Sequence, residues 1–265
     1  MWIKELFHGR KPVIGMVHLD ALPGTARYNG KEGLEGVIRN ARLDYDNLVQ
    51  GGIDGVIFCN ENDKPYCKKA GPEVAAAMTA IVSAVTHGQR SVPFGIDIQW
   101  DVMGALAVAM VTGASFVRGI ACGTFCGDLG VFYADTEAIM KYRRAIGAEG
   151  VKILTNLTPE FSSTMDARPI TLVAQTVPKS SLVDGICVSG VMAGVAAPYT
   201  QLMEIKEVVG DFTVVANTGV NFDTVDSILD IADACVVATC LKVDGKSHER
   251  IDQARVRKMM EIRKQ

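Results

Sequence analysis

Three carboxylates, one histidine and one arginine follow or interrupt short apolar runs, and these side-chain types suit proton-transfer chemistry. Glu61, Asp97 and Asp101 come after runs rich in Val, Ile and Phe. Positioned carboxylates exchange protons as general acids or bases, so these three are candidates for that role. His18 is a candidate general base, although a histidine at a strand end is at least as often purely structural. Arg118 lies within SFVRGI, where a buried guanidinium needs an anionic partner and could neutralise developing charge.

A second group of residues is suited to hold an anion. The run VVANTGVN (214–221) ends on small polar residues, and VATCLKVDG (237–245) is similar in character. Backbone N–H groups and hydroxyls in such loops can bind a phosphate. The alternative is a simple turn into a helix, capped by Asn221 or Asp223. The candidate substrate- and phosphate-binding residues are Ser189, Gly190, Asn217, Thr218, Gly219 and Thr239, and Asn156 joins the catalytic candidates.

Eight short apolar runs must position these residues. They are rich in Val and Ile without clean alternation, as expected for parallel strands covered on both faces. Segments with helical spacing separate them, and most of these segments end in glycine. The repeat predicts an α/β protein, a single (β/α)8 TIM barrel with a closed parallel sheet, formed as one domain by residues 1–265. The predicted strands are 12–19, 53–60, 92–99, 114–120, 150–157, 183–190, 212–219 and 233–240.

The alternative architecture is an open, doubly wound sheet. It would lead us to expect a GxGxxG motif after the first strand, which the sequence lacks. In a closed barrel the carboxyl ends of all strands meet at one mouth, so the candidate residues would share one site. Two long segments, 20–33 and 123–135, follow predicted strands and are candidate lids over that mouth.

Composition and charge restrict the function classes. The 265 residues are 48% hydrophobic and 22% charged, which is ordinary globular usage. A formal net charge of −3 argues against a nucleic-acid partner, the segment 1–12 has no apolar core of signal-peptide length, and no apolar run reaches the length of a membrane span. Seven cysteines, several inside apolar runs, favour a reducing compartment, so we expect a soluble cytoplasmic protein. No metal-specific spacing occurs and no metal ligand is predicted, which leaves a divalent cation held by the carboxylates as an open alternative.

Several stretches resemble the BtpA family along almost the entire chain. They are PVIGMVHLDALPGTARY (12–28), GGIDGVIFCNENDKPY (51–66), GPEVAAAMT (71–79), GASFVRG (113–119) and DACVVATCLKVDG (233–245). The resemblance implies a phosphate-binding TIM barrel, and the family includes a bacterial member encoded in a sugar operon. Members have also been linked with nucleoside triphosphate hydrolysis and, in cyanobacteria, with photosystem I biogenesis. The chain has no GxxxxGK[ST] loop, so a hydrolase of the P-loop kind has no physical support here.

The chain also departs from the family pattern. Where relatives have an Asp followed by a Lys-His pair after the fifth strand, this sequence reads TNLTPEFSS (155–163), and NTG replaces the usual Gly-Ser-Gly of the seventh strand. If the Lys-His pair is catalytic in relatives, this chain has altered or lost that chemistry, and a divergent subfamily is one interpretation of the difference. We expect an enzyme, an isomerase, lyase or hydrolase, that acts on a small phosphorylated sugar-like or nucleoside-derived metabolite. The alternative is a non-catalytic BtpA-type protein that binds a metabolite or assists assembly, and apolar helices such as 71–85 could form a homo-oligomer in either case.

Overall fold

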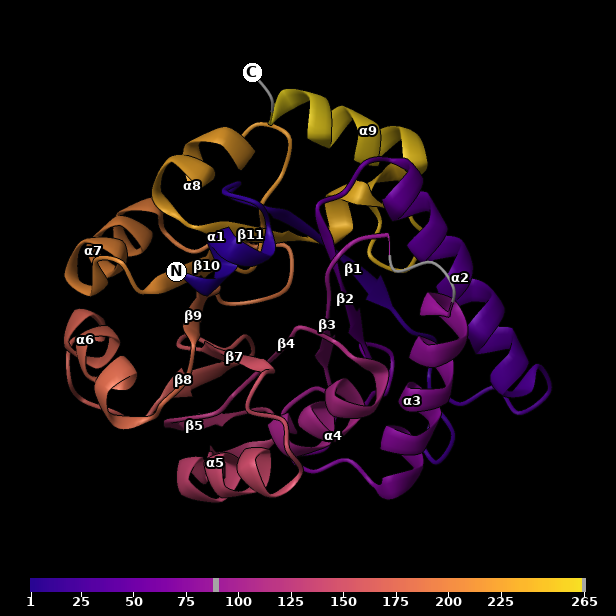
Figure 1. Ribbon diagram of the computed structural model, residues 1–265, viewed down its shortest axis with the longest axis horizontal. Coiled ribbons are helices and arrows are strands. Elements are labelled where there is room, and N and C mark those ends of the chain that lie inside the picture. Colours follow the sequence, from indigo (N-terminus) through magenta and orange to yellow (C-terminus); the bar gives the residue numbers. More distant parts are fainter. Residues whose placement is uncertain (88–90, 264–265) are drawn as a thin grey trace.

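The structure is a computed structural model that describes residues 1–87 and 91–263. Its centre is a closed barrel of parallel strands surrounded by helices (Figure 1). Around the barrel the strands follow the order β1, β2, β3, β4, β7, β9, β10, β11 and back to β1, so the predicted (β/α)8 architecture is confirmed. The barrel strands are β1 (Val13–His18), β2 (Gly55–Cys59), β3 (Phe94–Asp97), β4 (Phe116–Gly119), β7 (Lys152–Asn156), β9 (Gly185–Val188), β10 (Thr213–Ala216) and β11 (Ala234–Val237).

The helices return the chain to the start of each next strand. α4 shows the local rules: the Asp101 side chain caps its first turn by accepting from the Gly104 N–H, and Gly113 ends it in a left-handed conformation with φ of 76°. The helices are α1 (Trp2–Leu6), α2 (Gly33–Gln50), α3 (Pro72–Thr86), α4 (Val102–Thr112), α5 (Thr136–Ala145), α6 (Ile170–Ser180), α7 (Tyr199–Val209), α8 (Val225–Ile231) and α9 (Gln253–Ile262), with short 3-10 turns η1 (Thr239–Leu241) and η2 (Val243–Gly245).

Two hydrophobic layers hold the barrel together. The outer layer lies between strands and helices and includes Ile96 and Val117. The inner layer lies within the barrel, where Phe116 packs with Ile3 and Phe7 from the amino-terminal segment. Segment 1–7, with α1, therefore closes the amino-terminal end of the barrel (Figure 1).

A small antiparallel sheet projects from the barrel, and two of its three strands lie in the predicted lid segment 123–135. β5 (Thr124–Gly127) and β6 (Gly130–Tyr133) form a hairpin, and β8 (Ser162–Thr164) pairs with β5. Segment 123–135, predicted as a long loop, is therefore largely regular structure. Phe132 of β6 packs edge-on against Trp100, with ring centroids 5.2 Å apart, so the hairpin supports an aromatic side chain beside the carboxyl end of β3.

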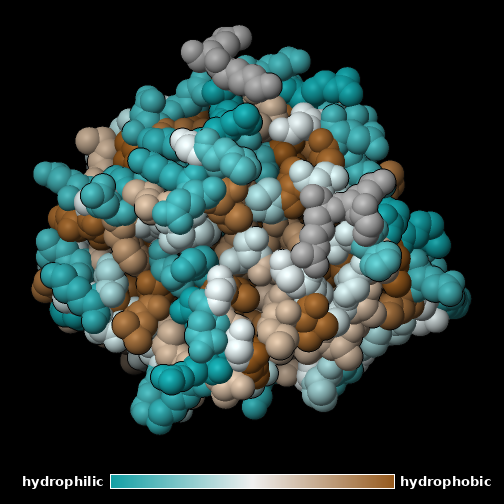
Figure 2. Space-filling model, viewed as in Figure 1, coloured by the Kyte–Doolittle hydropathy of each residue, from teal (hydrophilic) through white to brown (hydrophobic). Residues whose placement is uncertain are grey.

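The outer surface is mixed in character. On the face shown in Figure 2, hydrophobic residues occur in scattered groups between hydrophilic ones. Within residues 1–87 and 91–263, no helix combines the length and the apolar character needed to cross a bilayer.

Candidate active site

Strand alternation brings the predicted polar residues to one place. Because successive side chains of a strand point to opposite faces, the residues two positions after an inward apolar residue also point inward. Phe116 lies inside the barrel, and Arg118 is two positions after it. Asn156 is likewise two positions after the inward-facing Leu154. A cavity of about 270 Å³ opens at the carboxyl ends of the strands. The predicted residues that line it are His18, Glu61, Asp97, Arg118, Asn156, Asn217, Thr218, Gly219 and Thr239.

A buried ion pair occupies the floor of the cavity. Arg118 donates from Nε to Asp97 Oδ2 at 3.0 Å and also from Nη2 to the same oxygen. The exposed fractions of the two side chains are only 9% and 3%. Burial opposes the charge on Arg118, but Asp97 outweighs it and raises the pKa of the guanidinium. Asp97, on the neighbouring strand β3, is therefore the anionic partner that the sequence predicts for Arg118.

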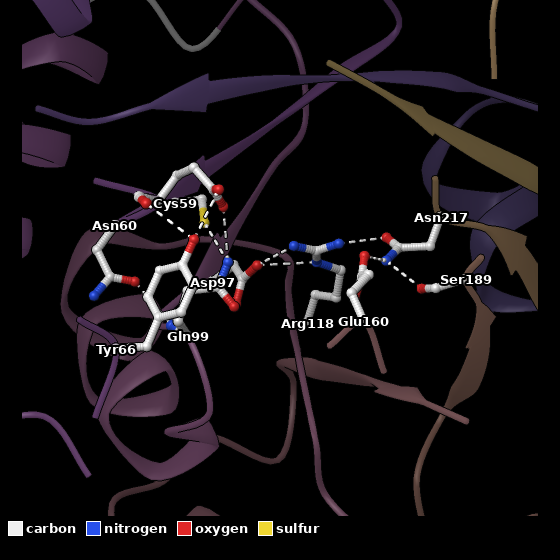
Figure 3. Close-up of polar contacts among 10 residues, drawn as sticks. Cys59, Asn60, Tyr66, Asp97, Gln99, Arg118, Glu160, Ser189 and Asn217 are labelled. Carbon is white, nitrogen blue, oxygen red and sulfur yellow. Dashed lines mark hydrogen bonds and ion pairs between the residues drawn. The ribbon is translucent and has the colours of Figure 1, made fainter. Parts of the chain in front are cut away.

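Asn217 extends this network across the barrel. Its side-chain oxygen accepts from Arg118 Nη1, and its Nδ2 donates to Ser189 Oγ at 2.8 Å and to Glu160 Oε1 at 3.3 Å. Figure 3 shows Arg118 between Asp97 on one side and Asn217 on the other. Ser189 is thus placed to orient Asn217, while Glu160 reaches the same cavity from the loop after β7.

Glu61 is the centre of a second polar cluster. Its Oε1 accepts from the Tyr66 hydroxyl at 2.8 Å, its Oε2 accepts from Gln99 Nε2 at 3.0 Å, and Lys64 Nζ lies 3.4 Å from Oε1. Burial opposes ionisation, but interactions with His18, Tyr66 and Lys64 outweigh it, so the pKa of Glu61 lies below its ordinary value. Glu61 is therefore an ionised carboxylate at neutral pH.

Glu160 has the opposite environment. Burial raises its pKa above the ordinary value, and the nearby Arg118 only partly offsets that effect. Its carboxyl group accepts one side-chain hydrogen bond, from Asn217, whereas the carboxylate of Glu61 has three polar neighbours. The pKa values of two glutamates on the same cavity are thus shifted in opposite directions, a pattern that suits an acid and base pair.

His18 and Asn156 both line the cavity. Burial lowers the pKa of His18 to about 4, so its imidazole is neutral at physiological pH. Asn156 is 7% exposed, and its side-chain oxygen has no hydrogen-bond partner among the described residues. A buried unpaired amide is costly unless a ligand or water satisfies it, so Asn156 is suited to contact a bound substrate.

Asp101 lies outside this constellation. One carboxylate oxygen accepts from the Gly104 N–H at 2.9 Å, and the other accepts from the Ala70 N–H at 3.0 Å. It does not line the cavity. The side chain therefore caps α4 and fastens segment 60–71 to it, and we leave Asp101 out of the candidate catalytic set.

The β9 and β10 loops are joined to each other by two of the predicted phosphate ligands. The Gly190 N–H donates to Thr218 Oγ1 at 2.7 Å, and that hydroxyl donates to the Val195 carbonyl at 2.8 Å. Gly219 has φ of 69°, and a Cβ there would lie 2.0 Å from Ala196 N. Thr218, Gly190 and Gly219 thus shape the loops by close contact, and the Thr218 hydroxyl and the Gly190 N–H are occupied by these bonds.

Backbone amides remain available for an anion at the same end of the cavity. Among the described residues, no acceptor is bonded to the N–H groups of Gly219, Val220, Thr239 and Cys240. All four residues line the cavity, on the loops after β10 and β11. This is the usual position of a phosphate site in such barrels, and it supports the predicted assignment of Gly219 and Thr239.

Tyr66, Trp100 and Arg255 are among the lining residues that the sequence analysis did not select. Tyr66 belongs to an irregular segment outside the predicted strands; Arg255 belongs to α9, fifteen residues after Cys240. Trp100 lies three residues after the end of β3, so an aromatic residue near a strand end was the one available signal. No group of three or more His, Cys, Asp or Glu residues with metal-binding geometry occurs among residues 1–87 and 91–263.

A closed (β/α)8 barrel with one polar cavity at the carboxyl ends of its strands is the class of protein that the fold and site define. The chain belongs to the BtpA family, whose model matches residues 9–265. It is 39% identical to the sgc region protein SgcQ of Escherichia coli (strain K12), over 98% of this chain and 97% of that protein. It is 31% identical to the photosystem I biogenesis protein BtpA of Synechocystis sp., over 97% of this chain and 89% of that protein.

Solved structures share the fold at low sequence identity. A phosphoribosyl anthranilate isomerase from Thermus thermophilus superposes with a TM-score of 0.54 at 12% identity, covering 94% of this chain and 97% of that one. A native KDPGal structure gives a TM-score of 0.57 at 13% identity, covering 96% and 94%. At these identities the likeness concerns the barrel fold alone.

Proposed function

We propose that this protein is an enzyme that acts on a small phosphorylated metabolite, either sugar-like or nucleoside-derived. The observation that carries the proposal is a single cavity with two chemically different ends. One end has the unbonded amides of the β10 and β11 loops, which suit a phosphate. The other end has Arg118, two glutamates and a neutral histidine, which suit proton transfer.

The glutamates divide the proton-transfer roles. Glu61, ionised and held by Tyr66 and Gln99, is the base that removes a proton from the substrate. Glu160, with a raised pKa, is the acid that donates one. Arg118 lies on the cavity floor beside Glu160 and stabilises negative charge that develops on a substrate oxygen. Isomerases, lyases and hydrolases all use such a division. It therefore assigns roles to the residues without selecting one of these reaction types.

The experiment is a turnover screen with phosphorylated aldoses, phosphorylated ketoses and nucleoside monophosphates, followed by mass spectrometry and NMR. We expect conversion of at least one compound by the wild type. Glu61→Gln and Glu160→Gln should each reduce that rate by about 100-fold or more, the usual contribution of a general acid or base. Failure of the wild type to bind any of these compounds at millimolar concentration would contradict the proposal.

A second candidate is a non-catalytic metabolite-binding or assembly role. The Synechocystis relative is named a photosystem I biogenesis protein. Exposed apolar side chains lie in the loops after β7 and β9, with exposed fractions of 41% for Phe161, 78% for Val191 and 48% for Met192. Such residues beside the mouth suit a protein partner. Phosphate binding without turnover of any compound in the screen would favour this candidate.

A further inference from the structure

Arg255 of α9 is a cation at the anion-binding end of the cavity. Its Nε donates to the Cys240 carbonyl at 2.7 Å, and its guanidinium carbon lies 5.2 Å from the centroid of the Phe222 ring. Within the described residues, no carboxylate forms an ion pair with Arg255. The guanidinium is thus fixed by a carbonyl and an aromatic face, and its charge is not neutralised by the protein.

The neighbouring groups are donors. Arg255 lines the cavity together with the residues whose amides lack acceptors on the β10 and β11 loops, and it is bonded to the second of these loops through Cys240. Gly245 borders the same region, where a Cβ would lie 3.4 Å from Arg255 Nη2. Asp244, on the same turn, is 68% exposed and pairs with Lys246 at 3.1 Å. A group of unbonded N–H donors with one unpaired guanidinium favours a compact anion of high charge.

We propose that Arg255 is the charged residue of this anion subsite and that its ligand is the dianion of a terminal phosphate monoester. A monoester presents three terminal oxygens, which can accept from both loops and from the guanidinium together. A diester has one charge and two such oxygens, and a carboxylate has two in a plane, so both match the donors less well. This inference rests on the proposed function, because it assigns the group that the substrate places at that end.

Lys258 provides a matched control on the same helix. Its Nζ lies 4.7 Å from the centroid of the Phe222 ring, so it shares an aromatic neighbour with Arg255. Lys258 does not line the cavity, whereas Arg255 does. Removal of the Lys258 charge therefore changes the net charge and the ring contact without changing the subsite.

The experiment measures binding by isothermal titration calorimetry. The probes are inorganic phosphate, methyl phosphate, dimethyl phosphate and acetate, each added to wild type, Arg255→Met, Arg255→Gln and Lys258→Met. We expect the wild type to bind methyl phosphate at least 10-fold more tightly than dimethyl phosphate or acetate. Both Arg255 variants should weaken methyl phosphate binding by at least 10-fold, while Lys258→Met should stay within twofold. Melting curves of all four proteins identify the Arg255 variant that retains the native fold.

The outcomes separate this inference from the proposed function. If the wild type binds methyl phosphate and a folded Arg255 variant binds it equally well, the role of Arg255 is wrong and the proposed function stands. Equal or tighter binding of dimethyl phosphate or acetate by the wild type would refute the monoester assignment. A wild type that binds neither phosphate nor methyl phosphate would contradict the proposed function as well.

Discussion

Asp97→Asn tests the electrostatics on which the cavity floor depends. The substitution keeps the shape of the side chain and removes its charge. Arg118, 8% exposed, then keeps the bond to Asn217 and the proximity of Glu160 but loses its principal counter-charge. We therefore expect the folded state to lose stability, because a buried guanidinium is left without full compensation.

The expected size follows from the burial of both partners. Removing one member of a buried ion pair costs about 3–5 kcal/mol in free energy of unfolding. Glu160 can ionise beside Arg118 and recover part of this, so we expect the lower end, about 3 kcal/mol. At about 2–4 °C per kcal/mol for a chain of this size, the melting temperature should fall by about 6–12 °C.

The assay is urea unfolding at pH 7.5 followed by circular dichroism. The control is Glu137→Gln on α5, which breaks an exposed pair with Lys141 whose side chains are 76% and 75% exposed; it should cost no more than about 0.5 kcal/mol. The double variant Asp97→Asn/Arg118→Met should be more stable than Asp97→Asn alone, because it removes the uncompensated charge. A loss below about 1 kcal/mol for Asp97→Asn would refute the reasoning.

Two further predictions concern His18 and Asp101. The folded-state pKa of His18, about 4, lies below its ordinary value of 6.5. The contribution of neutral His18 to the free energy of unfolding is therefore complete above pH 6.5 and is lost as the pH falls toward 4. Between pH 7 and pH 5 the wild type should lose about 2 kcal/mol more than His18→Gln in urea unfolding, and parallel losses would contradict this. Asp101→Ala should cost about 1 kcal/mol through loss of the α4 cap and leave the affinity for inorganic phosphate unchanged; a loss of phosphate affinity in titration calorimetry would return Asp101 to the site.

The sequence predicts the barrel well because its strands are continuous apolar runs. Parallel strands buried on both faces leave a clear signal, and the closed topology then places their carboxyl ends together. Asp97, Arg118 and Asn217 could therefore be assigned to one cavity although the chain separates them widely. The hairpin of β5 and β6 gave no such signal, since its strands are four residues each and partly exposed.

The fine assignment of polar groups is beyond what a single sequence can provide. Thr218 and Gly190 looked like phosphate ligands, but their polar groups bond to the neighbouring loop, a contact between segments far apart in sequence order. Asp101 looked like an acid in the mouth and is a helix cap. Arg255 reaches the cavity from a helix outside the barrel, so neither strand position nor motif spacing could identify it.

The position of a bound phosphate tests the central claim most directly. Crystals soaked in methyl phosphate should show its phosphoryl group between Gly219, Thr239 and Arg255, with the methyl group directed toward Arg118 and the two glutamates. A phosphoryl group bound at Arg118 instead, with the β10 and β11 loops empty, would contradict the two-ended cavity on which the proposed function rests.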